Sequence, residues 1–354
     1  MTAFINRIGT ATPAHDIHAA FVQFASAGLP DSKMRAVFDR MAARSGIAHR
    51  YSHLRPGKLA DGEVDADGFY PRAGFPGTAA RMAEYATAAL KLALAAVAAL
   101  GTEADRITHL VVASCTGFTA PGLDLQLAAA LGLPSRVART MVGFMGCAAA
   151  VPALRIADQA VRADPGARVL VVNIELCSLH LQQTEDIETA LALLLFGDGC
   201  SAALVSADPM GIALGDFRAE ILPDSAGLIT WNIGDHGFLM HLSGQVPGRI
   251  AAALRADIGM PDGLLRGTAP ADIGLWAVHG GGRTVLDAVE IGLALPGDAL
   301  RFSRAVLRDF GNMSSATIMF VLARMLAEKA GGTGIAMAFG PGMVAETFRF
   351  SLSA

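Results

Sequence analysis

The segment ADRITHLVVASCTG, residues 104–117, combines an acidic lead-in, a buried apolar run and a loop that ends on glycine. APADIGLWAVHGGG, residues 269–282, repeats that plan. A second pair of similar segments, LLFGDGCSAALV at 194–205 and MAFGPGMVAETF at 337–348, keeps the same order along the chain. Similar segments in a conserved order indicate duplicated structural units. The chain is therefore predicted to be built from two related halves.

Around these segments the chain alternates short β-rich runs with longer alanine-rich stretches. Short apolar runs are typical of buried strands, and they occur at 109–114, 169–174, 201–206, 275–280 and 334–340. Helices are expected at 78–100, closed by Gly101, and at 126–131, 149–163, 187–195, 248–256, 300–309 and 315–328. This alternation predicts an α/β fold with covered sheets, divided into an N-terminal half, 1–206, and a C-terminal half, 207–354.

The composition excludes several classes of protein. The 354 residues are 53% hydrophobic and 17% charged, with a net charge of −4 and no basic tract, so nucleic acid is not expected as a partner. The N-terminus lacks a signal pattern, and the alanine–leucine stretch 86–100 contains Lys91 and is too short to cross a bilayer. We expect a cytoplasmic protein with no membrane insertion. The turn-rich segment 55–77 is predicted to be a surface loop.

The cysteines do not form a metal-binding or disulfide pattern. None belongs to a C-x-x-C pair, which argues against structural zinc, and four in a chain of this size argue against a disulfide framework. A cysteine in such a chain is usually a small buried apolar residue. The four are Cys115, Cys147, Cys177 and Cys200.

Cys147 stands apart because of its neighbours in VGFMGCAAAVPALRIAD, residues 142–158. Gly146 permits a tight turn, and the alanines leave space above the sulfur. A helix that begins near Ala150, with Pro152 in its first turn, places the thiol at the positive end of the helix dipole. That position lowers a thiol pKa and makes it nucleophilic. The alternative is a packed cysteine at a close helix contact.

Two other polar residues lie on glycine-flanked turns and complete a chemical set with Cys147. A thiolate nucleophile needs a partner that takes its proton, and His279 in WAVHGGGRTVLD ends an apolar strand beside three glycines. Asn312 in DFGNMSSATIMF precedes a hydroxyl-rich helix start. Alone, His279 also fits a core histidine and Asn312 a helix cap. Together the three supply a nucleophile, a base and an amide donor.

At this point the chain resembles a known family. GFMGCAAA, LFGDG, VHGGG, FGNMSSAT and FGPGMVAET match, in order, motifs of the type III polyketide synthases, the chalcone synthase-like superfamily of the thiolase fold, and the resemblance covers nearly the whole chain. It implies a thiolase-like five-layered αβαβα fold of two similar halves, and a homodimer. It also implies a catalytic triad of Cys147, His279 and Asn312, with Phe196 of LFGDG as a gatekeeper.

The implied reaction is an acyl transfer from coenzyme A (CoA) thioesters. Cys147 is expected to take an acyl-CoA starter and to extend it by decarboxylative condensation with malonyl-CoA, with no metal or redox cofactor. His279 and Asn312 are expected to donate hydrogen bonds to the enolate oxygen, each worth roughly 3–4 kcal/mol in the transition state. CoA contacts are implied for Arg40, Arg44, Gly281 and Gly282.

The resemblance is incomplete at the CoA-binding segment and in the pocket. A third basic position of that segment holds Val37, which leaves its role to Lys33 or Arg35, and a solvated helix face is the alternative for all of these cations. Trp231 replaces a glycine of the plant enzymes and Met240 a second gatekeeper phenylalanine. We therefore expect a smaller or redirected cavity that makes short pyrones, resorcinols or phloroglucinols. The remaining predicted pocket residues are Cys115, Cys177, His180 and Ser314, with Cys115 alternatively a packed core thiol.

Other functions are compatible with parts of the pattern. A ketoacyl synthase III acting on acyl carrier protein uses the same triad, but GNMSSAT and FGPG favour the polyketide synthase. A papain-like hydrolase also has its cysteine, histidine and asparagine in this order along the chain, but the alternating α/β pattern does not fit that fold. An inactive relative is disfavoured because all three triad residues are retained.

Overall fold

The computed structural model describes residues 1–58, 63–71, 74–101 and 103–353. Within these, a nine-stranded sheet has the strand order β11-β12-β13-β8-β1-β7-β6-β4-β5. The strands are β1 (Phe4–Ala11), β2 (His15–Asp16), β3 (Tyr51–Ser52), β4 (His109–Ser114), β5 (Ala138–Gly143), β6 (Val169–Leu176), β7 (Asp198–Ser206), β8 (Ile212–Ile221), β9 (Ile229–Gly234), β10 (Gly237–Leu242), β11 (Leu275–Val278), β12 (Gly332–Gly340) and β13 (Val344–Leu352). The α-helices are α1 (His18–Gly28), α2 (Ser32–Ala43), α3 (Thr78–Leu100), α4 (Leu123–Leu131), α5 (Ala150–Ala163), α6 (Ile187–Leu193), α7 (Val246–Asp257), α8 (Arg283–Leu293), α9 (Arg301–Phe310) and α10 (Ala316–Ala327).

The strand order repeats on either side of the β1–β8 junction. Counted outward from that junction, the N-terminal half runs β1-β7-β6-β4-β5 and the C-terminal half runs β8-β13-β12-β11. In each half, the strand that comes first along the chain lies at the junction, and the strand that comes last along the chain pairs with it in the sheet. The sequence echoes fall on equivalent strands, because 104–117 contains β4 and 269–282 contains β11. The prediction of two similar halves is therefore confirmed.

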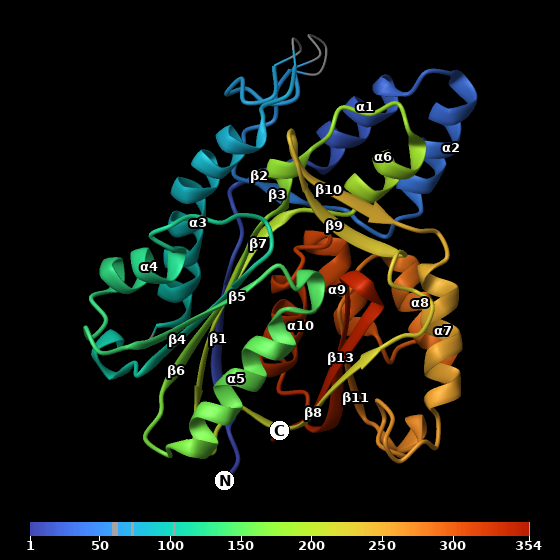
Figure 1. The fold of residues 1–354 in the computed structure, drawn as a ribbon. Helices are drawn as coiled ribbons and strands as arrows, with labels where there is room; N and C mark the ends of the chain where they lie inside the picture. The colour runs from blue at the N-terminus through green and yellow to red at the C-terminus, as the bar shows by residue number, and fades with distance from the viewer. Residues whose placement is uncertain (59–62, 72–73, 102, 354) are drawn as a thin grey trace.

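The two half-sheets and the helices form five layers. Helices α5 and α10 pack between the half-sheets, with Val111 and Ala113 of β4 facing them. The alternate residues, Leu110 and Val112, face α3 and α4 on the outside, and α7 and α8 cover the outer face of the C-terminal half. A strand buried on both faces reads as a continuous apolar run. Figure 1 shows α3 and α4 on one side of the molecule, α7 and α8 on the other, and α5 and α10 between them.

The N-terminal segment contributes more structure than the sequence pattern indicated. β1 pairs with β7 and β8 at the centre of the sheet, and α1 and α2 precede the predicted loop. Within residues 63–71 that loop has no helix or strand, as predicted, but it is not confined to the surface: Tyr70 is buried and donates to the Ser178 carbonyl. Residues 59–62 and 72–73 of the predicted loop lie outside the described residues.

Helix α3 is the one described helix with the length and composition to cross a membrane. Here it packs against β1 and β7, and buried Ala96 and Leu100 lie against Gly9 of β1. Its Arg81 is also buried and donates to the carbonyls of Leu179 and Leu181. These contacts are those of a core helix, because a buried guanidinium needs fixed protein acceptors.

Candidate active site

Cys147 lies in the 3-10 turn Gly146–Ala148, directly before α5. The turn needs glycine, because Gly146 has a φ of +60° and a Cβ there would lie 2.3 Å from Pro341 Cδ. This close approach joins the cysteine turn to the FGPG loop, residues 339–342. Helix α5 begins at Ala150, with Pro152 in its first turn, as predicted.

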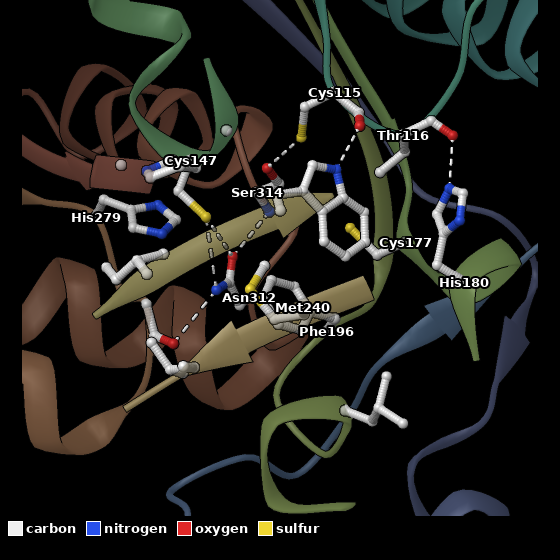
Figure 2. A pocket seen from close by; sticks show the side chains of 18 of the residues that line it. Cys115, Thr116, Cys147, Cys177, His180, Phe196, Met240, His279, Asn312 and Ser314 are labelled. Atoms are coloured by element: carbon white, nitrogen blue, oxygen red, sulfur yellow. Dashed lines mark hydrogen bonds between the residues drawn. The ribbon is translucent and has the colours of Figure 1, made fainter. Parts of the chain in front are cut away.

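Both ends of the Asn312 amide lie near the Cys147 sulfur, and the thiol donates to Oδ1 at 3.9 Å. Its Oδ1 accepts from the Ser314 N–H at 2.8 Å, and its Nδ2 donates to the Gly281 carbonyl at 3.3 Å. Nδ2 lies 4.0 Å from the Cys147 sulfur. The two amide contacts fix which end of the side chain is the donor. Figure 2 shows these contacts at one end of the pocket.

His279 follows β11, where its N–H donates to the Met337 carbonyl. Within the described part of the chain, neither ring nitrogen has a hydrogen-bond partner, and the side chain is buried. Burial lowers the pKa of His279 to about 4, which keeps the ring neutral. The ring stands beside the Cys147 sulfur (Figure 2). A neutral imidazole with free nitrogens can accept one proton and donate another.

The electrostatics of Cys147 differ from the prediction made from its position before a helix. Burial raises its pKa to about 11, although hydrogen bonds from Ser314 and Asn312 act in the opposite direction. The predicted lowering by the helix dipole is therefore wrong for the side chain taken alone. The reason is that removing a thiolate from water outweighs the partial charge of one helix end.

One pocket brings most of the predicted site residues together. Its walls also include Phe339, Gly340 and Pro341 of the FGPG loop. Gly282 does not line it and directly precedes α8, and Arg40 and Arg44 lie exposed on and after α2. The predicted residues in the pocket are Cys115, Cys147, Cys177, His180, Phe196, Trp231, Met240, His279, Gly281, Asn312 and Ser314.

The far wall of the pocket is a hydrogen-bonded aromatic cluster. Trp231 donates its indole N–H to the Cys115 carbonyl at 2.7 Å. His180 donates from Nε2 to the Thr116 carbonyl at 2.7 Å and accepts the Phe238 N–H at Nδ1. The His180 ring stacks on Phe238 with centroids 4.2 Å apart, and burial lowers its pKa to about 4. His180 is therefore a neutral residue that holds this wall.

Cys115 is held as a thiol inside the same wall. Its sulfur lies 3.4 Å from Glu175 Oε2 and 3.1 Å from the Ser314 hydroxyl. Burial raises the pKa of Cys115 well above its ordinary value, and the pKa of Cys177 shifts in the same direction. All four cysteines are free.

Some lining residues carried no usable sequence signal. Ile17, Phe21 and Arg50 reach the pocket from the N-terminal segment. Arg50 is 1% exposed and donates to the carbonyls of Leu193 and Phe196. It falls inside the segment 38–51 that resembles the CoA-binding region, but a charged residue gives no indication of its own burial.

Comparisons with known proteins agree with this geometry. The family model for the chalcone and stilbene synthase N-terminal domain matches residues 2–209, and that for the C-terminal domain matches residues 215–352. The alpha-pyrone synthesis polyketide synthase-like Pks18 of Mycobacterium tuberculosis is 36% identical over 271 residues, which cover 73% of this chain and 68% of that protein.

Solved structures show the same similarity over the whole chain. The crystal structure of PKS-I from the brown alga Ectocarpus siliculosus has a TM-score of 0.87 and 30% identity, covering 99% of this chain and 98% of its own. CsyB complexed with CoA-SH has a TM-score of 0.84 and 25% identity, covering 99% and 100%.

A duplicated αβαβα arrangement with a cysteine turn at the start of a central helix defines a thiolase-fold enzyme. The chain belongs to the chalcone and stilbene synthase family and is a type III polyketide synthase, an acyltransferase.

Proposed function

We propose that this enzyme loads an acyl group from an acyl-CoA onto Cys147, extends it with malonyl-CoA and releases an α-pyrone. The observation that carries the proposal is the convergence of the Cys147 sulfur, the free ring nitrogens of His279 and the Asn312 amide in one pocket. The name of the Mycobacterium relative, which refers to alpha-pyrone synthesis, supports the product class.

In the loading step, the proton of Cys147 moves to His279 as the sulfur attacks the thioester carbonyl. The tetrahedral intermediate collapses, the carbon–sulfur bond to CoA breaks, and the imidazolium returns its proton to the departing CoA thiolate. Transfer from thiol to imidazole creates the nucleophile without adding net charge to the buried pair. Asn312 Nδ2, which lies 4.0 Å from the sulfur, donates to the carbonyl oxygen in this step.

In the extension step, malonyl-CoA loses CO₂, and the electron pair of the broken bond passes to the thioester oxygen. The enolate oxygen then accepts hydrogen bonds from His279 and from Asn312 Nδ2, groups that are already in place where the charge develops. The enolate carbon attacks the acyl carbonyl on Cys147 and displaces the sulfur as a thiolate, which leaves the extended chain on CoA. For the next extension, Cys147 attacks that thioester and CoA departs as in the loading step. Phe196 shapes the mouth of the pocket and takes no part in proton transfer. Every group in these steps comes from the chain or from the CoA thioesters, so the proposal includes no cofactor.

The apolar lining favours an aliphatic starter. Ile229, Val246, Ile250 and Leu242 line the pocket with Met240, and such side chains gain free energy by covering an alkyl chain. After two extensions, attack of the distal enol oxygen on the thioester carbonyl closes a six-membered lactone and expels the thiol. That product is a triketide pyrone.

We also propose that the enzyme is a cytoplasmic homodimer. Exposed apolar side chains gather on and around the edge strand β5: Phe118, Leu125, Met141 and Met145. An apolar group of this kind on a sheet edge favours association with another chain. Light scattering at micromolar concentration tests this proposal, and a monomer would contradict it.

The proposed reaction is tested with hexanoyl-CoA and malonyl-CoA and without acyl carrier protein, with products identified by liquid chromatography and mass spectrometry. We expect a triketide pyrone from the wild type, and neither product nor a protein-bound acyl group from Cys147→Ala. A resorcinol or phloroglucinol as the main product would overturn the lactone step. Activity that depends on acyl carrier protein would instead support a ketoacyl synthase.

A further inference from the structure

The start of α8 forms part of the rim of the active-site pocket. Gly281 and Val285 line the pocket that contains Cys147. Arg283 lies between them in sequence as the first residue of α8. Its side chain is 52% exposed, so the guanidinium stands in solvent where the chain leaves the pocket.

This rim is shared with the end of α2, which is far away in sequence. Arg283 Nη1 donates to the Arg44 carbonyl at 3.2 Å. The two segments approach closely, because a Cβ on Gly46 would lie 3.8 Å from Arg283 Cδ. Arg40 lies one helical turn before Arg44 on α2 and is exposed as well. Three guanidinium groups thus occupy the two elements that meet at this rim.

Arg283 is only loosely engaged by protein acids. Asp287, one turn along α8, lies 3.5 Å from its Nε but accepts a shorter contact of 2.7 Å from Arg304. Exposed ion pairs of this kind contribute little. The N-terminus of α8 adds the positive end of a helix dipole at the same place. The rim therefore favours a ligand with several negative charges.

We propose that Arg283 is a binding residue for the phosphates of CoA thioesters, acting beside Arg40 and Arg44. This inference rests on the proposed function, in which the thioester reaches Cys147. Arg283 takes the place of the third basic residue of the CoA-binding segment, a position that holds Val37 in this chain. Val37 lies on the same helix face as Arg40. Arg35 is directed elsewhere, since its Nε donates to the Leu29 carbonyl, and Lys33 lies about 16 Å before Arg44 along α2.

The test measures acylation of Cys147 by intact-protein mass spectrometry, with hexanoyl-CoA and with the N-acetylcysteamine thioester of hexanoic acid. The second thioester carries no phosphate, so a phosphate contact cannot affect it. For Arg283→Gln we expect the half-saturating concentration of hexanoyl-CoA, divided by that of the phosphate-free thioester, to rise about threefold to tenfold. Arg283→Lys keeps the charge and should restore most of the wild-type ratio.

Arg255→Gln is the matched control, because this substitution removes the same charge at an exposed position in the last turn of α7. Arg255 lies about 14 Å along that helix from its first residue. Its ratio should equal that of the wild type. An unchanged ratio in Arg283→Gln would overturn the inference, and so would equal losses with both thioesters, which would assign Arg283 a structural role. If neither thioester acylated wild-type Cys147, the proposed function itself would fail, and both results are read in one experiment.

Discussion

In the proposed mechanism, His279 decides how Cys147 loses its proton. Taken alone, the thiol has a pKa of about 11 and the imidazole one of about 4, so burial disfavours either charge by itself. Moving the proton from sulfur to nitrogen creates two opposite charges that stabilise each other at low dielectric. The reactive thiolate is therefore a property of the pair, which explains why the two residues share a pocket closed to most water.

Substituting His279 should make Cys147 unreactive without removing the thiol. In His279→Gln, we expect the rate of alkylation of Cys147 by iodoacetamide at pH 7 to fall at least about tenfold, since only the thiolate reacts. Peptide mapping by mass spectrometry measures the rate at this residue, and Cys147→Ala gives the background. An unaltered rate would contradict the role of His279 as the group that takes the proton.

The same histidine should make the fold sensitive to acid. Its folded pKa of about 4 lies below the unfolded value of 6.5, so its contribution to stability is present above pH 6.5 and is lost as pH falls towards 4. Between pH 7 and pH 5 the wild type should lose about 2 kcal/mol through this residue. Urea unfolding of wild type and His279→Gln measures it, and equal losses in the two proteins would contradict the expectation.

At the scale of single elements, the cysteine turn depends on its contact with the FGPG loop. Gly146 and Gly132 have nearly the same φ, +60° and +64°, but a Cβ on Gly132 meets nothing within 4 Å. Gly132→Ala should therefore lower the free energy of unfolding by about 1–2 kcal/mol. Gly146→Ala should lower it by about 1–3 kcal/mol more and should slow acylation of Cys147. If Gly146→Ala and Gly132→Ala had equal effects on the free energy of unfolding and on the acylation rate, the Pro341 contact would have no role.

Strands β9 and β10 place Trp231 opposite Met240, and this pair limits the cavity. Trp231→Gly should lengthen or change the products, because it removes the ring and the hydrogen bond to the Cys115 carbonyl. Trp231→Phe keeps the aromatic bulk and loses only the donor, so its products should remain close to those of the wild type. Mass spectrometry of the products compares them, and an unaltered profile in Trp231→Gly would remove this residue from the cavity wall.

The burial pattern of a helix or strand determines whether it could be predicted from the sequence. β4 and β6 are buried on both faces and read as continuous apolar runs, while α3 ends at Gly101 with a φ of +64°. β8 alternates buried and exposed residues and then becomes exposed, so no apolar run reveals it. β1 contains Asn6 and Arg7 despite its central position. Helix α7 begins two residues before its predicted start because Pro247 is accommodated in the first turn.

The site was predicted less evenly than the fold. Residues on glycine-flanked turns, Cys147, His279 and Asn312, could be identified because motif and chemistry agree there. The pKa of Cys147 could not be predicted, since it depends on burial that only the assembled pocket produces. The contact between Arg283 and the Arg44 carbonyl could not be predicted either, because it joins positions 239 residues apart.

At the scale of the whole molecule, the two halves share a central core, in addition to the outer cluster that each half has. Helix α5 belongs to the N-terminal half but also contacts β8 and β13 of the C-terminal half. Leu154 of α5 is fully buried in the cluster that includes residues of both half-sheets. A half on its own would expose this surface to water, which is unfavourable in proportion to the apolar area. The halves repeated in the sequence are therefore expected to unfold as one cooperative unit.

Calorimetry distinguishes this expectation from two independent halves. Leu154→Ala, in the shared core, and Leu286→Ala, in the outer cluster that lies almost wholly in the C-terminal half, each create a buried cavity that should lower stability by about 2–5 kcal/mol. If the core is shared, both variants shift one single transition to lower temperature, and the calorimetric and van't Hoff enthalpies stay equal. If the halves are independent, Leu286→Ala lowers the temperature of one transition and leaves the temperature of the other unchanged, because only the C-terminal half has lost packing.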